Sequence, residues 1–394
     1  MLIRRSYDIG VKGIPPFVAS DTMLFTAVKE GASSPFTTKA FQFGRAGDEF
    51  TLENAGGTGG DSSISNARFI YAAASPDKQW FAAVHNTSDN PIILIWRNNG
   101  DGTMSFHASF NQLSGVPTKL VFSPDSTKLF ATGSGGGGAI LQYLKLTTGT
   151  WASQETMNNT TLGFNSPNSI SHHPTEDKLL IANGVVEGTI REVTYTASAF
   201  GSSVSIVSGV SNTRYLQPRY SPNGEYVIYG QNAGTVSPYT REIKLHKIGV
   251  GLVDTLDVSS VVRDVFGLSV MNDAQWFSNS SHAVFVTTDT ATADIAILIK
   301  RTGDSLSLEQ TIDYSADNPN IANISLTQDT NPLLAIGAGD PRAGTGGWVV
   351  SAERKHLRTL KFDSDTGLFD TTPVQDFTEG NVAAFAPSSA YPPA

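Results

Sequence analysis

A short phrase recurs along the chain roughly every 50 residues. It consists of a small or apolar run, the residues Ser-Pro-Asp or a degraded form of them, and a second apolar run. A period of this length predicts a fold made of repeated units that bury their apolar faces against one another. The copies are Ala74-Ser75-Pro76-Asp77, Phe122-Ser123-Pro124-Asp125, His172-His173-Pro174-Thr175, Tyr220-Ser221-Pro222-Asn223, Phe277-Ser278-Asn279-Ser280, Leu326-Thr327-Gln328-Asp329 and Phe385-Ala386-Pro387-Ser388.

A second marker, a glycine-centred tight turn, runs in step with the first. Examples are Asn99-Gly100-Asp101, Thr148-Gly149 and Thr302-Gly303-Asp304. Glycine and aspartate accommodate the positive φ that tight hairpins require. The alternating runs between the two markers, such as residues 79–84, are typical of strands rather than helices. We therefore expect each unit to form four antiparallel strands, which is the blade of a β-propeller. The seven hairpins predict seven such blades.

The two ends of the chain complement each other. Residues 381–387 form a last copy of the innermost strand with no further strands after it, whereas residues 22–43 supply later strands with little before them. We therefore expect one blade to be completed by both termini, which removes an open sheet edge. The prediction is an all-β, seven-bladed propeller over residues 17–389, preceded by a docking arm (1–16) and followed by a short tail (390–394).

Bulk properties exclude several classes of partner. The net charge of −9 gives no basic field for nucleic acid. The chain has no cysteine and therefore neither disulfides nor a thiolate zinc site. The N-terminal sequence shows no apolar core of a secretory signal, and no apolar stretch reaches the ~20 residues of a membrane span. We expect synthesis in a cytoplasm without a signal peptide, and no membrane span.

Aligning the innermost strands on the Ser-Pro-Asp phrase brings polar residues together at one mouth of the central channel. This ring is interpreted either as channel hydration or as a ligand site. Asp273 is the single carboxylate at the mouth, and with neighbouring amide oxygens it offers oxygen ligands to Ca²⁺ or Mg²⁺. The predicted ring consists of Thr118, Lys119, Asn168, Gln217, Arg219, Asp273, Asn323 and Asn381, and the candidate ligand-binding residues among them are Lys119, Asn168, Arg219, Asp273, Asn323 and Asn381.

Other motifs are better explained by structure than by chemistry. His172 and His173 are adjacent on a strand, so they point to opposite faces and do not readily share a metal. Residues 133–138 match G-x-G-x-x-G, but a strand pattern follows them where a dinucleotide site needs a helix. We expect a packed histidine at position 172 and a loop over the glycine run.

The Ser-Pro-Asp turns and the phrase over residues 360–369, Leu-Lys-Phe-Asp-Ser-Asp-Thr-Gly-Leu-Phe, resemble the lactonase-type, YVTN-like seven-bladed propellers. The resemblance covers residues 17–389. It implies a mouth bearing acidic, Asn, His and Arg groups, and Asn168, Arg219, Asp273 and Asn323 fall in similar places. The chain is also similar in style to propeller proteins of tailed-phage virions, which lack signal peptides and are poor in cysteine. Fold markers of this kind are shared by many functions.

The favoured hypothesis is a non-enzymatic assembly module without a cofactor, a tail or capsid-associated component of a phage virion. Its partners would be protein subunits of a larger assembly, including other copies of the chain. The contacts would come from the arm, with Arg4 and Arg5, and from an insertion with the apolar anchors Trp348 and Val349.

Two alternatives stay open. One is a metal-dependent hydrolase of the lactonase type, in which a divalent ion such as Ca²⁺ at Asp273 polarises a lactone carbonyl. The other is a carbohydrate-binding propeller in which Trp96, Trp151 and Trp348 stack on sugar rings.

Overall fold

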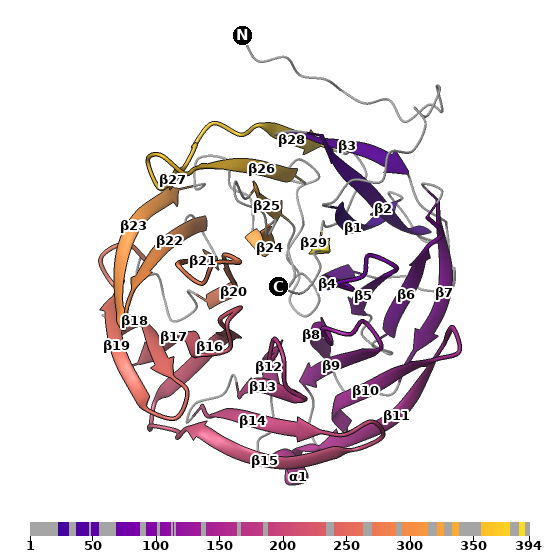
Figure 1. Ribbon diagram of the computed structural model, residues 1–394, viewed down its shortest axis with the longest axis horizontal. Helices are drawn as coiled ribbons and strands as arrows, with labels where there is room; N and C mark the ends of the chain where they lie inside the picture. The colour runs from indigo at the N-terminus through magenta and orange to yellow at the C-terminus, as the bar shows by residue number, and fades with distance from the viewer. Residues whose placement is uncertain are drawn as a thin grey trace, which may run out of the picture.

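The computed structural model shows an all-β chain whose strands form separate antiparallel sheets around a common centre (Figure 1). Its single described helix, α1 (Asn159–Leu162), is one turn long. Among the described residues, no helix has the length and apolar character needed to cross a membrane. The structure describes residues 23–30, 37–46, 49–54, 68–86, 92–100, 103–111, 113, 116–134, 139–163, 167–183, 188–233, 240–262, 270–288, 294–313, 321–326, 333–338, 356–378 and 386–390.

Within most sheets, strands adjacent in sequence are hydrogen-bonded neighbours, and the first strand lies nearest the centre (Figure 1). Four of these sheets comprise β4 (Arg68–Ala74), β5 (Trp80–Asn86), β6 (Ile92–Asn98) and β7 (Met104–Phe110); β8 (Val116–Phe122), β9 (Lys128–Ser134), β10 (Ala139–Thr147) and β11 (Thr150–Asn158); β12 (Pro167–His172), β13 (Lys178–Asn183), β14 (Ile190–Tyr195) and β15 (Phe200–Val207); and β16 (Thr213–Tyr220), β17 (Tyr226–Ala233), β18 (Thr240–Lys247) and β19 (Gly251–Asp257).

The next two sheets continue around the centre. One comprises β20 (Val270–Trp276), β21 (His282–Thr288), β22 (Asp294–Thr302) and β23 (Ser305–Asp313). The other comprises β24 (Ile321–Leu326), β25 (Leu333–Ala338) and β26 (His356–Asp363), with an outer edge divided between β27 (Leu368–Phe369) and β28 (Gln375–Thr378). This division departs from the expected four strands, because β27 and β28 each pair with a different part of β26.

The remaining sheet joins segments from the two ends of the sequence. Its order is β29 (Ala386–Ala390), β1 (Met23–Glu30), β2 (Thr37–Ala46) and β3 (Glu49–Asn54). The innermost strand was expected over residues 381–387, but β29 extends to Ala390, which pairs with Met23. Pro387 therefore lies in a strand rather than a turn, which is possible because β29 is an edge strand and a proline there costs no ladder hydrogen bond. Residues 381–385 and 1–22 lie outside the described part.

The Ser-Pro-Asp phrase forms the turn between the first and second strands of a sheet. In the first copy, the Ser75 amide donates to Trp80 O at 2.8 Å, and the Trp80 amide donates to Ser75 Oγ at 2.9 Å. The Ser75 hydroxyl also donates to Asp77 Oδ1 at 2.5 Å, and this carboxylate accepts the Gln79 amide at 3.0 Å. The phrase recurs because each residue has a fixed role in closing this turn.

The structure corrects the register of one copy. The amide of Phe277 donates to His282 O at 2.9 Å, as the amide of Ser75 does in the first turn. Asn279 Oδ1 accepts the Ser281 amide at 2.9 Å, which is the role of Asp77. Phe277 therefore occupies the serine position, and the alignment built on Ser278 was wrong by one residue. Asp273 consequently moves one step along its strand.

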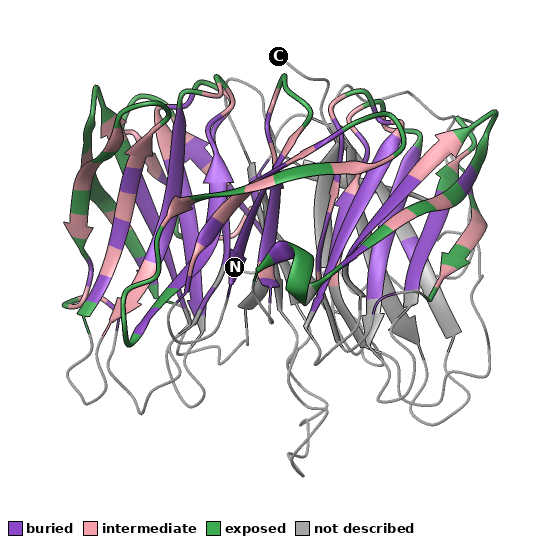
Figure 2. Cartoon of the chain, turned by 90° about the horizontal axis from the view of Figure 1, so that it is seen from below, coloured by how far each residue is buried: buried purple, intermediate pink, exposed green. Residues whose placement is uncertain are grey.

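The hydrophobic core lies between adjacent sheets. Trp80 and Trp151 from neighbouring sheets meet edge to face with ring centroids 5.7 Å apart, and Phe277 meets Phe362 in the same way at 4.9 Å. Where burial is described, the inner strands are mostly buried, whereas the outer strands β15 and β23 are largely exposed (Figure 2). This packing fixes the inner strands that carry the candidate site.

Candidate functional site

The inner strands carry a β-bulge at the same height in successive sheets. Register shifts fall just before Tyr71, Lys119, Ser169, Asp273 and Asn323, each of which pairs with the fifth residue of the neighbouring strand. A bulge re-aims the side chain beside it. We call the set Tyr71, Lys119, Ser169, Gln217 and Asp273 the charged layer; Gln217 holds this place on β16, inside a wider bulge.

A second layer lies two residues further along the same strands. Its members pair with the third residue of the neighbouring strand. We call it the cavity layer, and it consists of Ala73, Val121, Ser171, Arg219 and Gln275.

Asp273 is the centre of the charged layer and is fully buried. Its Oδ1 accepts Arg219 Nη2 at 2.7 Å and lies 3.3 Å from Lys119 Nζ. The same oxygen accepts the Ala274 amide at 3.0 Å, and Oδ2 accepts the Ile324 amide at 3.3 Å. Both oxygens of the buried carboxylate are thus satisfied by charged or backbone donors, as a buried charge requires.

Arg219 connects three sheets through one guanidinium. An arginine has five N–H donors, and here each of its three nitrogens is engaged. The group holds its neighbours in place and has little capacity left for a ligand. The acceptors are Ala274 O at 2.8 Å, Ser169 Oγ at 2.9 Å, Ile170 O at 2.9 Å, Asp273 Oδ1 at 2.7 Å, Pro218 O at 3.2 Å and Gln217 Oε1 at 3.4 Å.

The backbone of β16 is distorted where Arg219 leaves it. Gln217 has a positive φ of 49°, which is uncommon for a residue with a side chain. The bulge spans two residues, between Leu216 and Arg219. Gly230, which pairs with Leu216, has no room for a side chain, because a Cβ there would fall 1.9 Å from Met271 Sδ. This local geometry directs Arg219 back towards Asp273.

Lys119 lies across the channel from Arg219 and is 5% exposed. Its ammonium sits 3.8 Å from the centroid of the Tyr71 ring, in a cation–π contact. Burial lowers the pKa of Lys119 to about 8, and the positive charge of Arg219 adds to this, whereas Asp273 opposes it. A lysine with this pKa exchanges its proton close to neutral pH.

A cavity of about 390 Å³ lies beside the charged layer, on the side of the Ser-Pro-Asp turns. Its polar wall groups bond to the protein itself: Ser171 Oγ accepts the Tyr220 amide at 3.3 Å, and the Trp276 indole donates to Arg219 O at 3.2 Å. Gln275 bridges to the backbone of β24, at 3.1 and 3.0 Å. The remaining wall combines apolar residues, Val121 and Ile170 among them, with polar ones that include His172, His173 and Ser221.

The structure brings three of the candidate ligand-binding residues together, namely Lys119, Arg219 and Asp273. Asn168 is the bulged residue of β12, and its Oδ1 is buried without a hydrogen-bond partner. Asn323 directly follows the bulge of β24, at the place that Asp273 takes in its own strand. The predicted residues that lie outside the described part are Arg4, Arg5, Trp348, Val349 and Asn381.

Sequence reasoning placed Gln217 in the predicted ring but missed Tyr71 and Ser169 as members of the site. Tyr71 and Ser169 stand at the position of Lys119 in their strands, so a column alignment contained the signal. Nothing in the amino-acid sequence marks the bulges or the positive φ of Gln217.

The charged layer does not fit a divalent cation. The Asp273 carboxylate is shared by two cationic side chains, which would repel a bound ion. Across the described residues, no group of three or more histidines, cysteines, aspartates and glutamates is arranged to hold a metal. The prediction of a Ca²⁺ ligand at Asp273 is therefore not supported by the chemistry of its surroundings.

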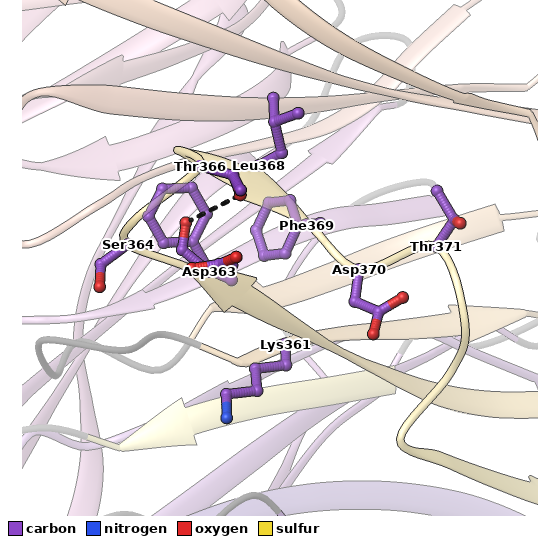
Figure 3. A pocket seen from close by; sticks show the side chains of 9 residues that line it. Lys361, Asp363, Ser364, Thr366, Leu368, Phe369, Asp370 and Thr371 are labelled. Atoms are coloured by element: carbon purple, nitrogen blue, oxygen red, sulfur yellow. Dashed lines mark hydrogen bonds between the residues drawn. The ribbon is translucent and has the colours of Figure 1, made fainter.

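The phrase over residues 360–369 lines a shallow hollow of about 600 Å³ at the outer edge of its sheet (Figure 3). Asp363 within the phrase and Asp370 directly after it serve local turns: Asp363 Oδ1 accepts the Asp365 amide at 2.9 Å, and Asp370 Oδ1 accepts the Thr372 amide at 2.9 Å. The phrase is therefore a structural element of the blade edge.

Aromatic and histidine candidates pack inside the fold. Trp96 and Trp151 are 0% and 3% exposed, so they cannot stack on sugars as the carbohydrate alternative requires. His172 contacts the Tyr195 hydroxyl and the His173 carbonyl, and burial lowers its pKa to about 4. A neutral, hydrogen-bonded histidine agrees with the expected packing role.

Comparison with known proteins finds similarity at the level of structure. No family model matches the sequence, and no curated protein matches it. A putative 6-phosphogluconolactonase from Bacteroides fragilis superposes with a TM-score of 0.63 at 12% identity, over 93% of this chain and 97% of that one. The periplasmic gluconolactonase PpgL of Pseudomonas aeruginosa gives 0.62 at 12% identity, over 93% and 99%.

The β-propeller domain of Swd1 from Myceliophteria thermophila gives a TM-score of 0.53 at 9% identity, over 80% of this chain and 89% of that one. The chain thus has the fold of the lactonase-like β-propellers. The hypothesis of a virion assembly module is contradicted by these comparisons, in which three of the similar structures are named as gluconolactonases or putative 6-phosphogluconolactonases.

Proposed function

We propose that the chain is a lactonase-type hydrolase that opens the lactone of a small sugar acid in its central channel. The observation that carries the proposal is Lys119, a buried lysine with a pKa near 8 held between Asp273 and the Tyr71 ring. General bases work best when their pKa lies near the operating pH. The proposal is also supported by the fold shared with two lactonase structures.

In the proposed reaction, the neutral Lys119 amine accepts a proton from water while the water oxygen attacks the lactone carbonyl. The ring C–O bond then breaks, and the Lys119 ammonium returns its proton to the departing alkoxide. One water is consumed and the sugar acid is released. Arg219 acts as a positioning residue, because it holds Asp273 and its charge lowers the pKa of Lys119.

We further propose that the sheets form a complete ring of seven blades, one of them shared between the two ends of the chain. The seven repeats of the glycine hairpin and the pairing of β29 with β1 support this count. Such a ring would hold the charged layer rigidly around the channel.

The test is the hydrolysis of gluconolactone and 6-phosphogluconolactone, measured as acid release above the buffer blank. We expect turnover that Lys119→Met reduces at least ~100-fold, the lower end of the contribution of a general base. Lys300→Met, at an exposed lysine of β22, is the matched control and should keep full activity. Absence of turnover on both substrates, or full activity in Lys119→Met, would overturn the proposal.

A further inference from the structure

We infer that the cavity on the turn side of the charged layer holds the body of the substrate, and that it takes neutral sugar lactones in preference to phosphorylated ones. This inference rests on the proposed hydrolysis and names the substrate class of that site. Three features of the cavity support it: its contact with the charged layer, the charge of its wall, and the hydrogen-bonding groups that the wall leaves open.

The cavity borders the proposed catalytic group at two of its lining residues, Tyr71 and Arg219. The centroid of the Tyr71 ring lies 3.8 Å from Lys119 Nζ, and Arg219 Nη2 lies 2.7 Å from Asp273 Oδ1. The cavity volume of about 390 Å³ falls within the ~300–1,000 Å³ that small-molecule sites occupy. A lactone whose carbonyl reaches Lys119 would therefore place the rest of its ring in this cavity.

The described part of the wall offers no free positive charge. Arg219 is the single lysine or arginine among the described lining residues, and all three of its nitrogens are engaged by the protein. Burial lowers the pKa of His172 to about 4 and also lowers the pKa of His173, so both rings are neutral at pH 7. The two repeat phrases over residues 326–329 and 385–388 contain no lysine or arginine in their sequence.

A phosphate group on the substrate would therefore lack a cationic partner in this cavity. It carries about −1.5 to −2 charges at neutral pH. Proteins recognise such a group with arginine or lysine side chains, and burying it without them is costly. The net charge of −9 on the chain gives no long-range attraction for an anion either. The wall thus disfavours phosphorylated lactones.

Two polar side chains of the wall keep hydrogen-bonding capacity for sugar hydroxyls. Ser171 is 7% exposed and its Oγ accepts the Tyr220 amide at 3.3 Å, while its own proton meets no acceptor in the described part of the chain. Gln275 Nε2 donates to Ile324 O at 3.1 Å, which uses one of its two N–H groups. The Trp276 side chain adds aromatic surface to the wall. Neutral donors beside an aromatic ring suit an uncharged, hydroxylated ring.

The test measures binding separately from turnover. The probes are 1,5-anhydroglucitol and its 6-phosphate, sugar rings that lack the lactone carbonyl and therefore cannot be hydrolysed as lactones. Their dissociation constants for the full chain are determined by NMR titration at pH 7. We expect the phosphate to bind at least ~10-fold more weakly, because its charge finds no partner in the wall. Equal or tighter binding of the phosphate, or no binding of the neutral probe, would overturn the inference.

A cation placed in the wall should shift this preference. Ser278→Lys, at a lining residue of the turn after β20, should reduce the ratio of the two dissociation constants at least ~5-fold, because it supplies the missing countercharge. Val204→Lys adds the same charge on the outer strand β15, where Val204 is 56% exposed, and should leave the ratio unchanged. If Ser278→Lys does not fold, Thr175→Lys, at an exposed lining residue, takes its place. A ratio that the cavity lysine leaves unaltered would count against the inference.

Failure of the preference is distinguishable from failure of the hydrolysis. Turnover of gluconolactone and 6-phosphogluconolactone with equal kcat/KM would leave the hydrolysis in place and overturn the preference. Selective binding of the neutral probe without turnover of either lactone would overturn the hydrolysis and retain the neutral ligand class of the cavity.

Discussion

The charged layer and the cavity layer lie two residues apart on the same inner strands, yet one contains buried charges and the other forms the wall of a cavity. In the charged layer, Asp273 is fully buried and Lys119 is nearly so, and the carboxylate lies 3.3 Å from the Lys119 ammonium. In the cavity layer, Val121 and Ser171 form a wall whose polar groups are satisfied locally. Arg219 starts in the second layer and reaches back to the first.

This difference shows that the position of a residue along an inner strand determines whether its side chain meets other side chains or borders the cavity. Side chains beside the bulges meet across the channel, so charges placed there can neutralise one another. Two residues later, the strands border a cavity, and unpaired charges would be costly. Substitutions that break the charged layer should therefore have larger effects than those at the turns.

The largest effect is expected for Asp273→Asn. It removes the shared carboxylate and leaves Arg219 and Lys119 buried beside each other, which costs about 3–5 kcal/mol of unfolding free energy. Chemical denaturation measures this change. Asp370→Asn, at an exposed turn, keeps its oxygen acceptor and should stay within ~0.5 kcal/mol of the parent. A loss below ~1 kcal/mol at Asp273 would mean that the charges are not coupled as described.

Arg219→Lys should be next in size. A lysine cannot reproduce the fork that bonds Ile170 O, Ala274 O and Asp273 Oδ1 together. Each buried acceptor left unpaired costs about 1–3 kcal/mol, so we expect a loss of about 3 kcal/mol. Arg214→Lys, at an exposed position of the same strand, is the control. A tolerated Arg219→Lys change would show that charge alone, not the fork, holds the layer.

Lys119 should make the free energy of unfolding depend on pH, and here the stability increases rather than decreases. Its folded-state pKa of about 8 lies below its ordinary value of 10.5, so between these values the unfolded chain binds more protons. The free energy of unfolding therefore rises with pH through this window, by up to about 3 kcal/mol. Below pH 8 the full penalty of the buried ammonium remains. Lys119→Met should abolish the rise, whereas Lys300→Met should retain it, as measured by denaturation from pH 7 to 10.5.

Most of the architecture could be predicted because it depends on local patterns. The turns at Ser75, Ser123 and Ser221 and the alternating strands each repeat a physical motif that a single sequence displays. Lys119, Arg219 and Asp273 were also identified as neighbours at the channel. Aligning the repeats shows that one side of the inner strands is more polar than the other, and that difference is visible without a structure.

The remaining features depend on tertiary geometry that the pattern does not encode. The register slip at Phe277 arose because a serine follows it, although the backbone uses Phe277 in the serine position. The bulges and the positive φ of Gln217 leave no compositional trace. The saturation of Arg219 by carbonyls of three sheets could not be foreseen either, and it separates a positioning residue from a ligand-binding one.

The smallest expected effect tests the corrected register directly. If Phe277 stands at the serine position, Ser278 corresponds to Pro76, Pro124 and Pro222, and its backbone should accept a proline. Ser278→Pro should then stabilise the fold by about 0.4–1 kcal/mol, because proline restricts the unfolded chain without straining the turn.

Asn279→Pro is the counterpart one residue later. Proline there would remove the side-chain oxygen that accepts the Ser281 amide and would place its ring at the second central position of the turn, where proline is disfavoured. We expect this variant to be less stable than the parent in the same thermal-melting series. A reversal of the two outcomes would restore the alignment on Ser278 and move Asp273 back to the start of its strand, away from the layer that contains Lys119.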